Sequence, residues 1–169
     1  MDFDLTDEQR MLAESVQRLV ASAYPDLEAR KAYRAEAKGY AAANWAAMAE
    51  MGLLALPLPE DQGGFGGGPV ETMIVMEAFG RGLVVEPYLA SIVLGLGLLR
   101  RVGGQDALVA QVAAGEITLA FAHQERQARH DLHDVATAAR RDGAAWVLDG
   151  AKGVVLHGDS ADRLIVSAR

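Results

Sequence analysis

Ala113–Ala122 reads AAGEITLAFA, and the period of the sequence changes within this stretch. Before it, apolar residues recur at helical spacing, and Gly115 ends the last predicted helix. After Gly115 comes a compact apolar run with β-branched residues, Ile117–Ala122, which is typical of a strand. Helices followed by strands indicate the α+β class. The sequence therefore predicts a helical bundle domain over residues 1–116, followed by the first strands of a small antiparallel β domain over residues 117–169.

The spacing of apolar residues predicts several helices before this stretch. Thr6 begins the first with a capping-box pattern, because Gln9 follows three residues later, and Pro25 ends it. The segment 26–38 is strongly charged and is predicted as a solvated helix or loop. The remaining predicted helices are Tyr40–Met51, Val70–Phe79, Pro87–Arg101 and Gln105–Ala114. We expect Trp45, Phe79 and Trp146 to be core residues.

Short strand-like runs follow the change of period. They are Val135–Arg140, Ala144–Leu148, Gly153–Leu156 and Arg163–Ala168. Asp142-Gly143 and Asp149-Gly150 separate the first three, and Asp-Gly is a strong hairpin signal. We therefore expect an antiparallel meander. Because these strands lack a closing element and leave an open edge, the β domain is expected to be incomplete.

Composition excludes several classes of function. Hydrophobic residues make up 51% of the 169 residues and charged residues 23%, which is the globular range. A net charge of −7 argues against nucleic acid or an anionic membrane surface as the main partner. The absence of cysteine excludes disulfides and thiolate metal sites. Met1–Asp4 is acidic, unlike a signal peptide, and Leu83–Leu99 is too interrupted for a membrane span, so we expect a cytoplasmic protein.

Three local motifs have both a structural and a functional interpretation. Gly63–Pro69 resembles a phosphate-binding loop, but no strand precedes it, which favours a flexible connection or a loop beside a ligand cavity. His130–Asp134 contains metal-ligand residue types, but without a second cluster a solvated loop is favoured and no metal is expected. Glu77 is a candidate buried carboxylate, and an ion pair with Arg81, four residues on, is favoured.

The order of six short motifs resembles the N-terminal portion of the acyl-CoA dehydrogenase family. The motifs are Phe3–Gln9, Gly52–Pro57, Pro59–Gly64, Glu77–Arg81, Ala120–Glu125 and Asp142–Lys152. Each is short, but their order and spacing together are specific, and the resemblance covers the whole chain.

The resemblance implies a fold and a chemistry. Members of the family have a helical N-terminal domain, a middle β domain and a C-terminal four-helix domain, and they act in fatty acid metabolism, including β-oxidation. They bind FAD and oxidise an acyl-CoA thioester: a carboxylate takes the α proton and flavin N5 takes the β hydride. An electron-transfer flavoprotein receives the electrons. Because the catalytic Glu of most members lies in the C-terminal domain, no catalytic residue is expected within residues 1–169.

Positions that match the family motifs are the expected site residues. Phe121 and Gln124 are expected to bind FAD, with Gln124 in place of a Thr that bonds the flavin ring. Ala90 and Leu94 lie on the segment that lines the acyl pocket in relatives, and His130 is expected near the substrate.

Other positions depart from the family pattern. Val154 and Leu156 replace a Trp and a Thr that contact the flavin, and Arg129 replaces a Gly. These departures leave two hypotheses open. The chain is either the N-terminal part of a dehydrogenase subunit, acting on an acyl-CoA or a dicarboxylyl-CoA, or a non-catalytic subunit that assembles with a catalytic one. The expected assembly is a homotetramer or a pair with a second dehydrogenase subunit.

Overall fold

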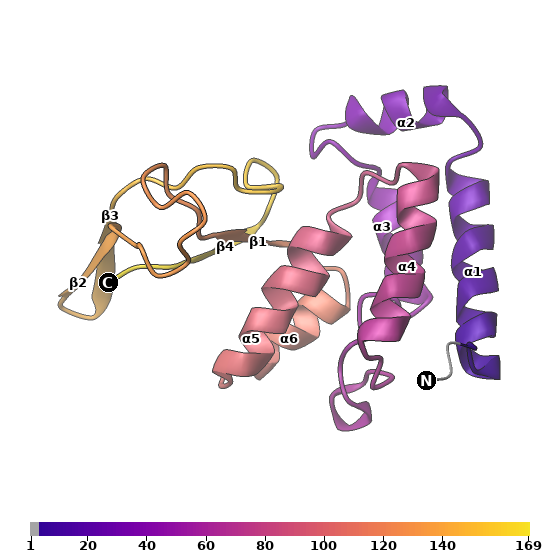
Figure 1. Cartoon of the computed structure of the whole chain (residues 1–169), viewed down its shortest axis with the longest axis horizontal. Coiled ribbons are helices and arrows are strands. Elements are labelled where there is room, and N and C mark those ends of the chain that lie inside the picture. Colours follow the sequence, from indigo (N-terminus) through magenta and orange to yellow (C-terminus); the bar gives the residue numbers. More distant parts are fainter. Residues whose placement is uncertain (1–3) are drawn as a thin grey trace.

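The computed structural model describes residues 4–169, and Met1, Asp2 and Phe3, which include the start of a family motif, lie outside it. The elements in chain order are α1 (Asp7–Ala23), α2 (Leu27–Arg34), α3 (Ala42–Glu50), the 3₁₀-helix η1 (Glu60–Gln62), α4 (Pro69–Gly82), the π-helix η2 (Leu89–Leu96), α5 (Gly97–Val102), α6 (Asp106–Ala113), β1 (Leu119–Ala122), β2 (Ala138–Asp142), β3 (Ala145–Asp149) and β4 (Arg163–Val166). The helices gather on one side and the strands on the other (Figure 1). The predicted α+β class is confirmed.

The first helix begins as its sequence predicts. Thr6 Oγ1 accepts the Gln9 N–H at 3.2 Å, and Gln9 Oε1 accepts the Thr6 N–H at 3.0 Å, so the capping box is complete. Gln9 Nε2 also donates to Glu71 Oε1 at 2.7 Å, which joins α1 to α4. The charged segment after Pro25 contains α2, whose first turn is capped by the Asp26 carboxylate.

An apolar core fills the space between the helices. Its fully or almost fully buried members include Val16, Trp45, Met48, Leu54, Val75, Phe79, Tyr88 and Leu96. The expectation that Trp45 and Phe79 are core residues is confirmed. Among residues 4–169, no helix is long and apolar enough to cross a membrane.

The segment predicted as one helix over Pro87–Arg101 is divided into η2 and α5. The wider π turns of η2 pack against β1, which joins the helices to the strands. Leu119 N–H donates to the buried Ser91 Oγ at 3.0 Å. A Cβ on Gly95 would lie 2.6 Å from the Leu119 Cβ, so only glycine permits this approach.

The strands form two separate pairs, and the predicted meander is wrong. β2 and β3 form the expected antiparallel hairpin, with Asp142 opposite Ala145. β4 instead pairs in parallel with β1, with Leu119 opposite Arg163. The reason lies at Asp162, whose Oδ2 accepts hydrogen bonds from the N–H and from the hydroxyl of Thr118, each at 2.9 Å. These bonds hold the start of β4 beside β1.

The run Gly153–Leu156 is not a strand, and Asp149-Gly150 does not turn a second hairpin. A Cβ on Gly150 would lie 2.5 Å from Thr137 Oγ1, so a glycine at this position allows its backbone to pack closely against Thr137. The expectation for Trp146 is also wrong, because its side chain is 65% exposed. The β2–β3 hairpin projects from the body, where the described residues do not cover it (Figure 1).

Candidate functional site

A cavity of about 620 Å³ lies where the helices meet the loop that precedes β4. Its walls come from α2, the C-terminal half of α4, the segment 83–90 and the loop 156–160. Most of the wall is apolar, with Met76, Phe79, Leu83, Val84, Val85, Leu89 and Ala90. Cavities of this size with a few polar groups are typical of small-molecule sites.

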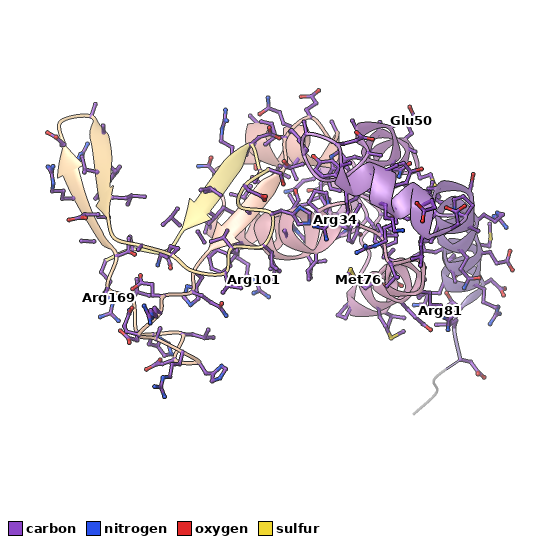
Figure 2. The ribbon with its side chains drawn as sticks, turned by 90° about the horizontal axis from the view of Figure 1, so that it is seen from above. Arg34, Glu50, Met76, Arg81, Arg101 and Arg169 are labelled. Carbon is purple, nitrogen blue, oxygen red and sulfur yellow. The ribbon has the colours of Figure 1, made fainter. Side chains whose placement is uncertain are left out.

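Cationic side chains from α2 and the following turn line one side of the cavity. Arg30 Nε donates to the Leu83 carbonyl oxygen at 2.8 Å, and Lys38 pairs with Asp162 at 2.9 Å. The Arg34 side chain has no hydrogen bond or ion pair within residues 4–169. Figure 2 shows Arg34 at the end of α2 that faces the strands, near Met76 of α4. Arg34 therefore has a free guanidinium beside an apolar wall.

The cavity also contains a buried carboxylate, Glu86, which is only 6% exposed. It accepts hydrogen bonds from the Tyr24 hydroxyl and from Asn44 Nδ2, the latter at 3.0 Å. Burial, together with the hydrogen bond to Glu86, raises the pKa of Tyr24 far above its ordinary value. Tyr24 therefore remains a hydrogen-bond donor that orients the carboxylate.

His157 lines the opposite side of the cavity. Its backbone takes the left-handed conformation, with φ of 55°, and its ring meets the edge of Tyr40 at a centroid distance of 6.4 Å. Burial lowers the pKa of His157, so the imidazole is neutral near pH 7. Ser160 Oγ lies 3.4 Å from its Nδ1.

The residues expected to bind the acyl chain are not all in this cavity. Ala90 is buried and lines it, whereas Leu94 is partly exposed and does not. His130 is exposed in the loop after β1 and lies outside the cavity. Sequence reasoning missed Glu86, Arg34 and His157. His157 directly follows Leu156, one of the positions compared with the family pattern, and could have been found there.

The residues expected to bind FAD lie at the end of β1. Phe121 is half-buried, and its ring stacks on His123 with centroids 5.3 Å apart and 19° between the planes. The Gln124 side chain is exposed, and its backbone oxygen accepts the Gly153 N–H at 2.9 Å. This bond brings the segment with Val154 next to the end of β1.

A buried polar cluster supports this end of β1. Glu125 and Lys152 form an ion pair at 2.6 Å, with side chains only 3% and 8% exposed. Glu125 also accepts from Thr137, through its N–H at 3.0 Å and its hydroxyl at 2.6 Å. The hydrogen bond from Lys152, followed by those from Thr137 and Gln127, holds the pKa of Glu125 far below its ordinary value.

The residues present fit a flavin at the end of β1 better than at the segment with Val154 and Leu156. Phe121 and Gln124 leave an aromatic ring and an amide accessible. Arg129, which stands where the family has a glycine, has a left-handed backbone with φ of 50°, a conformation that favours glycine. Val154 is 83% exposed at φ of 48°, and neither it nor Leu156 offers a ring or a hydroxyl.

The other motifs lie outside the cavity. Glu77 is exposed and pairs with Arg81 at 2.5 Å, so the predicted ion pair is confirmed. The glycine loop folds back on its own connection, with the Gly66 N–H donating to the Leu58 oxygen at 2.7 Å. No group of His, Asp or Glu among residues 4–169 is arranged to hold a metal ion.

Comparisons with known proteins identify the family. The sequence profile of the acyl-CoA dehydrogenase N-terminal domain matches residues 6–116. Acyl-CoA dehydrogenase FadE12 of Mycobacterium tuberculosis is 33% identical over 131 residues, covering 74% of this chain and 33% of FadE12. The crystal structure of the ChsE4–ChsE5 complex from Mycobacterium tuberculosis is 27% identical, with a TM-score of 0.81, and covers 99% of this chain and 45% of that chain. The structure of PigA with FAD and proline is 25% identical, with a TM-score of 0.82, and the match covers 100% of this chain and 45% of the PigA chain.

The chain thus spans a third of the length of FadE12 and under half of the length of the two solved chains. The match over residues 6–116 includes every helix of the structure and ends just before β1. This chain belongs to the acyl-CoA dehydrogenase family.

Proposed function

We propose that this chain forms the helical wall and the start of the middle β domain of a flavin-dependent acyl-CoA dehydrogenase subunit. The single observation that carries the proposal is the 620 Å³ cavity between the start of η2 and the loop 156–160. The segment that lines the cavity leads into η2, which also packs on β1, so one helix connects the proposed acyl cavity with the strand that carries Phe121. The reaction is the oxidation of the Cα–Cβ bond of an acyl-CoA thioester.

The chain's own contribution is to bind and position the acyl-CoA and to exclude water from it. The apolar residues of α4 and of the segment 83–90 surround the acyl chain, so that its reacting carbons are kept from solvent. The α proton of a thioester becomes removable only where hydrogen bonds stabilise the enolate oxygen. FAD, when bound, accepts the hydride, and Phe121 and Gln124 would hold its ring. We place the catalytic base outside residues 1–169.

The charges in the cavity support a dicarboxylyl-CoA as substrate. Arg34 has an unpaired guanidinium at one side of an apolar cavity, and Arg30 lies one turn before it on α2. An aliphatic chain with a terminal carboxylate matches this combination, because Arg binds carboxylates through two parallel hydrogen bonds. Within the family, the sequence resembles the small subunit of pimeloyl-CoA dehydrogenase. Leu94 and His130 lie outside this cavity, so in this proposal they contact only a part of the acyl-CoA that extends beyond it.

Isothermal titration of the chain with pimeloyl-CoA and octanoyl-CoA tests the substrate proposal. Arg34→Gln should weaken pimeloyl-CoA binding about tenfold, the worth of one charge-assisted hydrogen bond, and leave octanoyl-CoA binding unchanged. Arg101→Gln is the matched control, because Arg101 is exposed at the end of α5, outside the cavity (Figure 2). Equal losses for both ligands would contradict carboxylate recognition, and failure of both to bind the unaltered chain would contradict the cavity assignment.

A second candidate is a non-catalytic subunit that assembles with a catalytic dehydrogenase. The absence of a ring at Val154 and of a hydroxyl at Leu156 favours it, since both weaken flavin binding. The partner would be a second dehydrogenase subunit, in place of the homotetramer expected for a self-sufficient enzyme, with an electron-transfer flavoprotein as electron acceptor. The visible spectrum separates the candidates. A flavin band in the protein purified alone supports the first, and a band that needs a co-expressed partner supports the second.

A further inference from the structure

We infer that Leu83 contacts the distal part of the acyl chain and so makes the affinity of the cavity depend on chain length. The inference rests on the proposed function and assigns a specificity-determining residue to it. Leu83 directly follows α4 and is one of the apolar residues that line the cavity. It is 52% exposed, so about half of its surface is available to a ligand.

The backbone of Leu83 has a conformation that leucine rarely adopts. Its φ of 52° and ψ of 41° are left-handed. Two hydrogen bonds fix this conformation, because the Leu83 N–H donates to the Gly80 carbonyl oxygen at 3.2 Å and the Val84 N–H donates to the Phe79 carbonyl oxygen at 3.0 Å. This pair of bonds is a Schellman motif, in which glycine is the usual residue at the left-handed position. A leucine there is strained, because its Cβ crowds the following carbonyl oxygen.

The glycine at the preceding position serves another purpose. A Cβ on Gly82 would lie 2.2 Å from Val20 Cγ1, so Gly82 permits the close approach of α4 to α1. The left-handed turn falls one residue later, on Leu83. The Leu83 carbonyl oxygen also accepts a hydrogen bond from Arg30 Nε at 2.8 Å, which ties the turn to α2. Because the backbone is held from both α4 and α2, the direction of the Leu83 side chain is fixed.

Packing against the core does not account for the leucine side chain. Val84, the next residue, packs on the buried core that contains Phe79. Among the residues that the structure describes, Leu83 belongs neither to that core nor to the partly buried residues around it. Backbone strain that packing does not explain is typical of ligand sites. The cavity is where the leucine side chain contributes, since a bound acyl chain removes its exposed methyl groups from water.

The neighbours of Leu83 indicate which part of the acyl chain it contacts. Arg30, whose side chain bonds to the Leu83 carbonyl oxygen, lies one turn before Arg34 on α2. Arg34 is the residue proposed above to bind the terminal carboxylate of the acyl chain. Leu83 therefore lies on the side of the cavity that receives the distal carbons. We expect an octanoyl chain to reach it and a butanoyl chain to end before it.

Isothermal titration with octanoyl-CoA and butanoyl-CoA tests the inference. Leu83→Ala should raise the Kd for octanoyl-CoA about fivefold, because the ligand no longer covers the leucine methyl groups, and should leave the Kd for butanoyl-CoA unchanged. Leu83→Met keeps an apolar side chain of similar volume, so its Kd for octanoyl-CoA should stay within about twofold of the unaltered chain. Val102→Ala is the matched control, because Val102 is 78% exposed at the end of α5, outside the cavity.

Leu83→Gly separates the ligand contact from the backbone. Both the glycine and the alanine variant lose the leucine side chain, but only glycine suits the left-handed backbone. Leu83→Gly should therefore melt roughly 2–4 °C above Leu83→Ala while its Kd for octanoyl-CoA rises at least as much. A melting temperature at or below that of Leu83→Ala would contradict the assigned strain.

Two results would overturn the inference and leave the acyl cavity in place. One is an unchanged Kd for octanoyl-CoA in the folded Leu83→Ala variant. The other is an equal loss for octanoyl-CoA and butanoyl-CoA, because Leu83 would then not respond to the distal carbons. If the unaltered chain binds neither ligand, the cavity assignment of the proposed function fails, and the inference fails with it.

Discussion

The helical and the strand regions of this protein bury different kinds of side chain. Within the described chain, every member of the buried apolar core except Leu119 lies before residue 113. After Ala122, the buried residues that the structure describes are polar, namely Glu125 and Thr137. The first region is stabilised by the removal of apolar surface from water, and the second by hydrogen bonds around one ion pair.

This difference predicts how each region responds to mutation. An apolar core loses free energy in proportion to the volume that a substitution removes. A buried polar cluster depends on all its members, because the loss of one leaves the others desolvated and unpaired. The end of β1, where the residues proposed to bind FAD lie, is supported by the second kind of interaction. The positions of those residues therefore depend on the hydrogen bonds of this polar cluster.

The largest effect is expected in the helical core. Leu96→Ala removes a fully buried side chain from η2 and should lower the free energy of unfolding by about 3 kcal/mol. Urea denaturation followed by circular dichroism measures it. Leu27→Ala, at a position 61% exposed, should change stability by less than about 0.5 kcal/mol. Similar losses in the two variants would contradict the assigned core.

A smaller and more local effect is expected from Lys152→Met. The substitution leaves the buried Glu125 carboxylate without its cation, so we expect Tm to fall by roughly 5–10 °C. Hydrogen exchange should accelerate at the Thr137 amide, which donates to Glu125, while α1 and α4 stay protected. Lys31→Met removes only a surface ion pair and serves as the control. Loss of protection in α1 and α4 as well would break the distinction between the two regions.

Tyr24→Phe tests a polar contact inside the helical region. It removes the hydroxyl that donates to Glu86 and that accepts the Val85 N–H at 3.2 Å. We expect a loss of about 1–3 kcal/mol, because the buried Glu86 loses a donor. Tyr33→Phe, which removes a neutral bond to the Ala23 carbonyl, should cost about 1 kcal/mol or less by the same urea assay. Equal losses would show that Glu86 does not need Tyr24.

The smallest effect is a pH dependence from His157. Burial lowers the pKa of His157 in the folded state, so the unfolded chain binds the proton first as pH falls. The contribution of neutral His157 to the free energy of unfolding is complete above about pH 6.5, the ordinary pKa of histidine. It is lost as the pH falls through the pKa of His157 in the folded state. His157→Gln should therefore flatten the slope of Tm between pH 6.5 and lower values, and His133→Gln should not. An unchanged slope in His157→Gln would contradict the burial of this imidazole.

Local signals in the sequence predicted the helices and the hairpin well. Thr6, Gln9 and Pro25 act within a few residues of each other, and so does the Asp142-Gly143 turn. The parallel pairing of β1 with β4 could not be predicted in this way. It depends on the contact of Asp162 with Thr118, two residues 44 positions apart, and neither residue belongs to a recognisable motif.

The candidate site was predicted where family motifs run along the chain and missed where the fold assembles it. Ala90 was predicted from its segment, and the start of that segment lines the cavity, but Leu94 of the same segment does not. Arg34 and Glu86 come together only through the packing of α2 against the segment 83–90. Trp146 was misplaced because an alternating strand pattern does not reveal whether another layer covers it.

The parallel pairing of β1 with β4 has a consequence for how this protein can change over evolution. Residues 123–162 leave the body and return to it at neighbouring points, because Leu119 and Ala122 stand opposite Arg163 and Val166. The β2–β3 hairpin at the far end of this excursion can gain or lose residues without altering the spacing of its two roots. Length variation among descendants should accordingly gather at the hairpin tip, around Gly143, and spare the loop 156–160, which lines the cavity through Leu156, His157, Asp159 and Ser160.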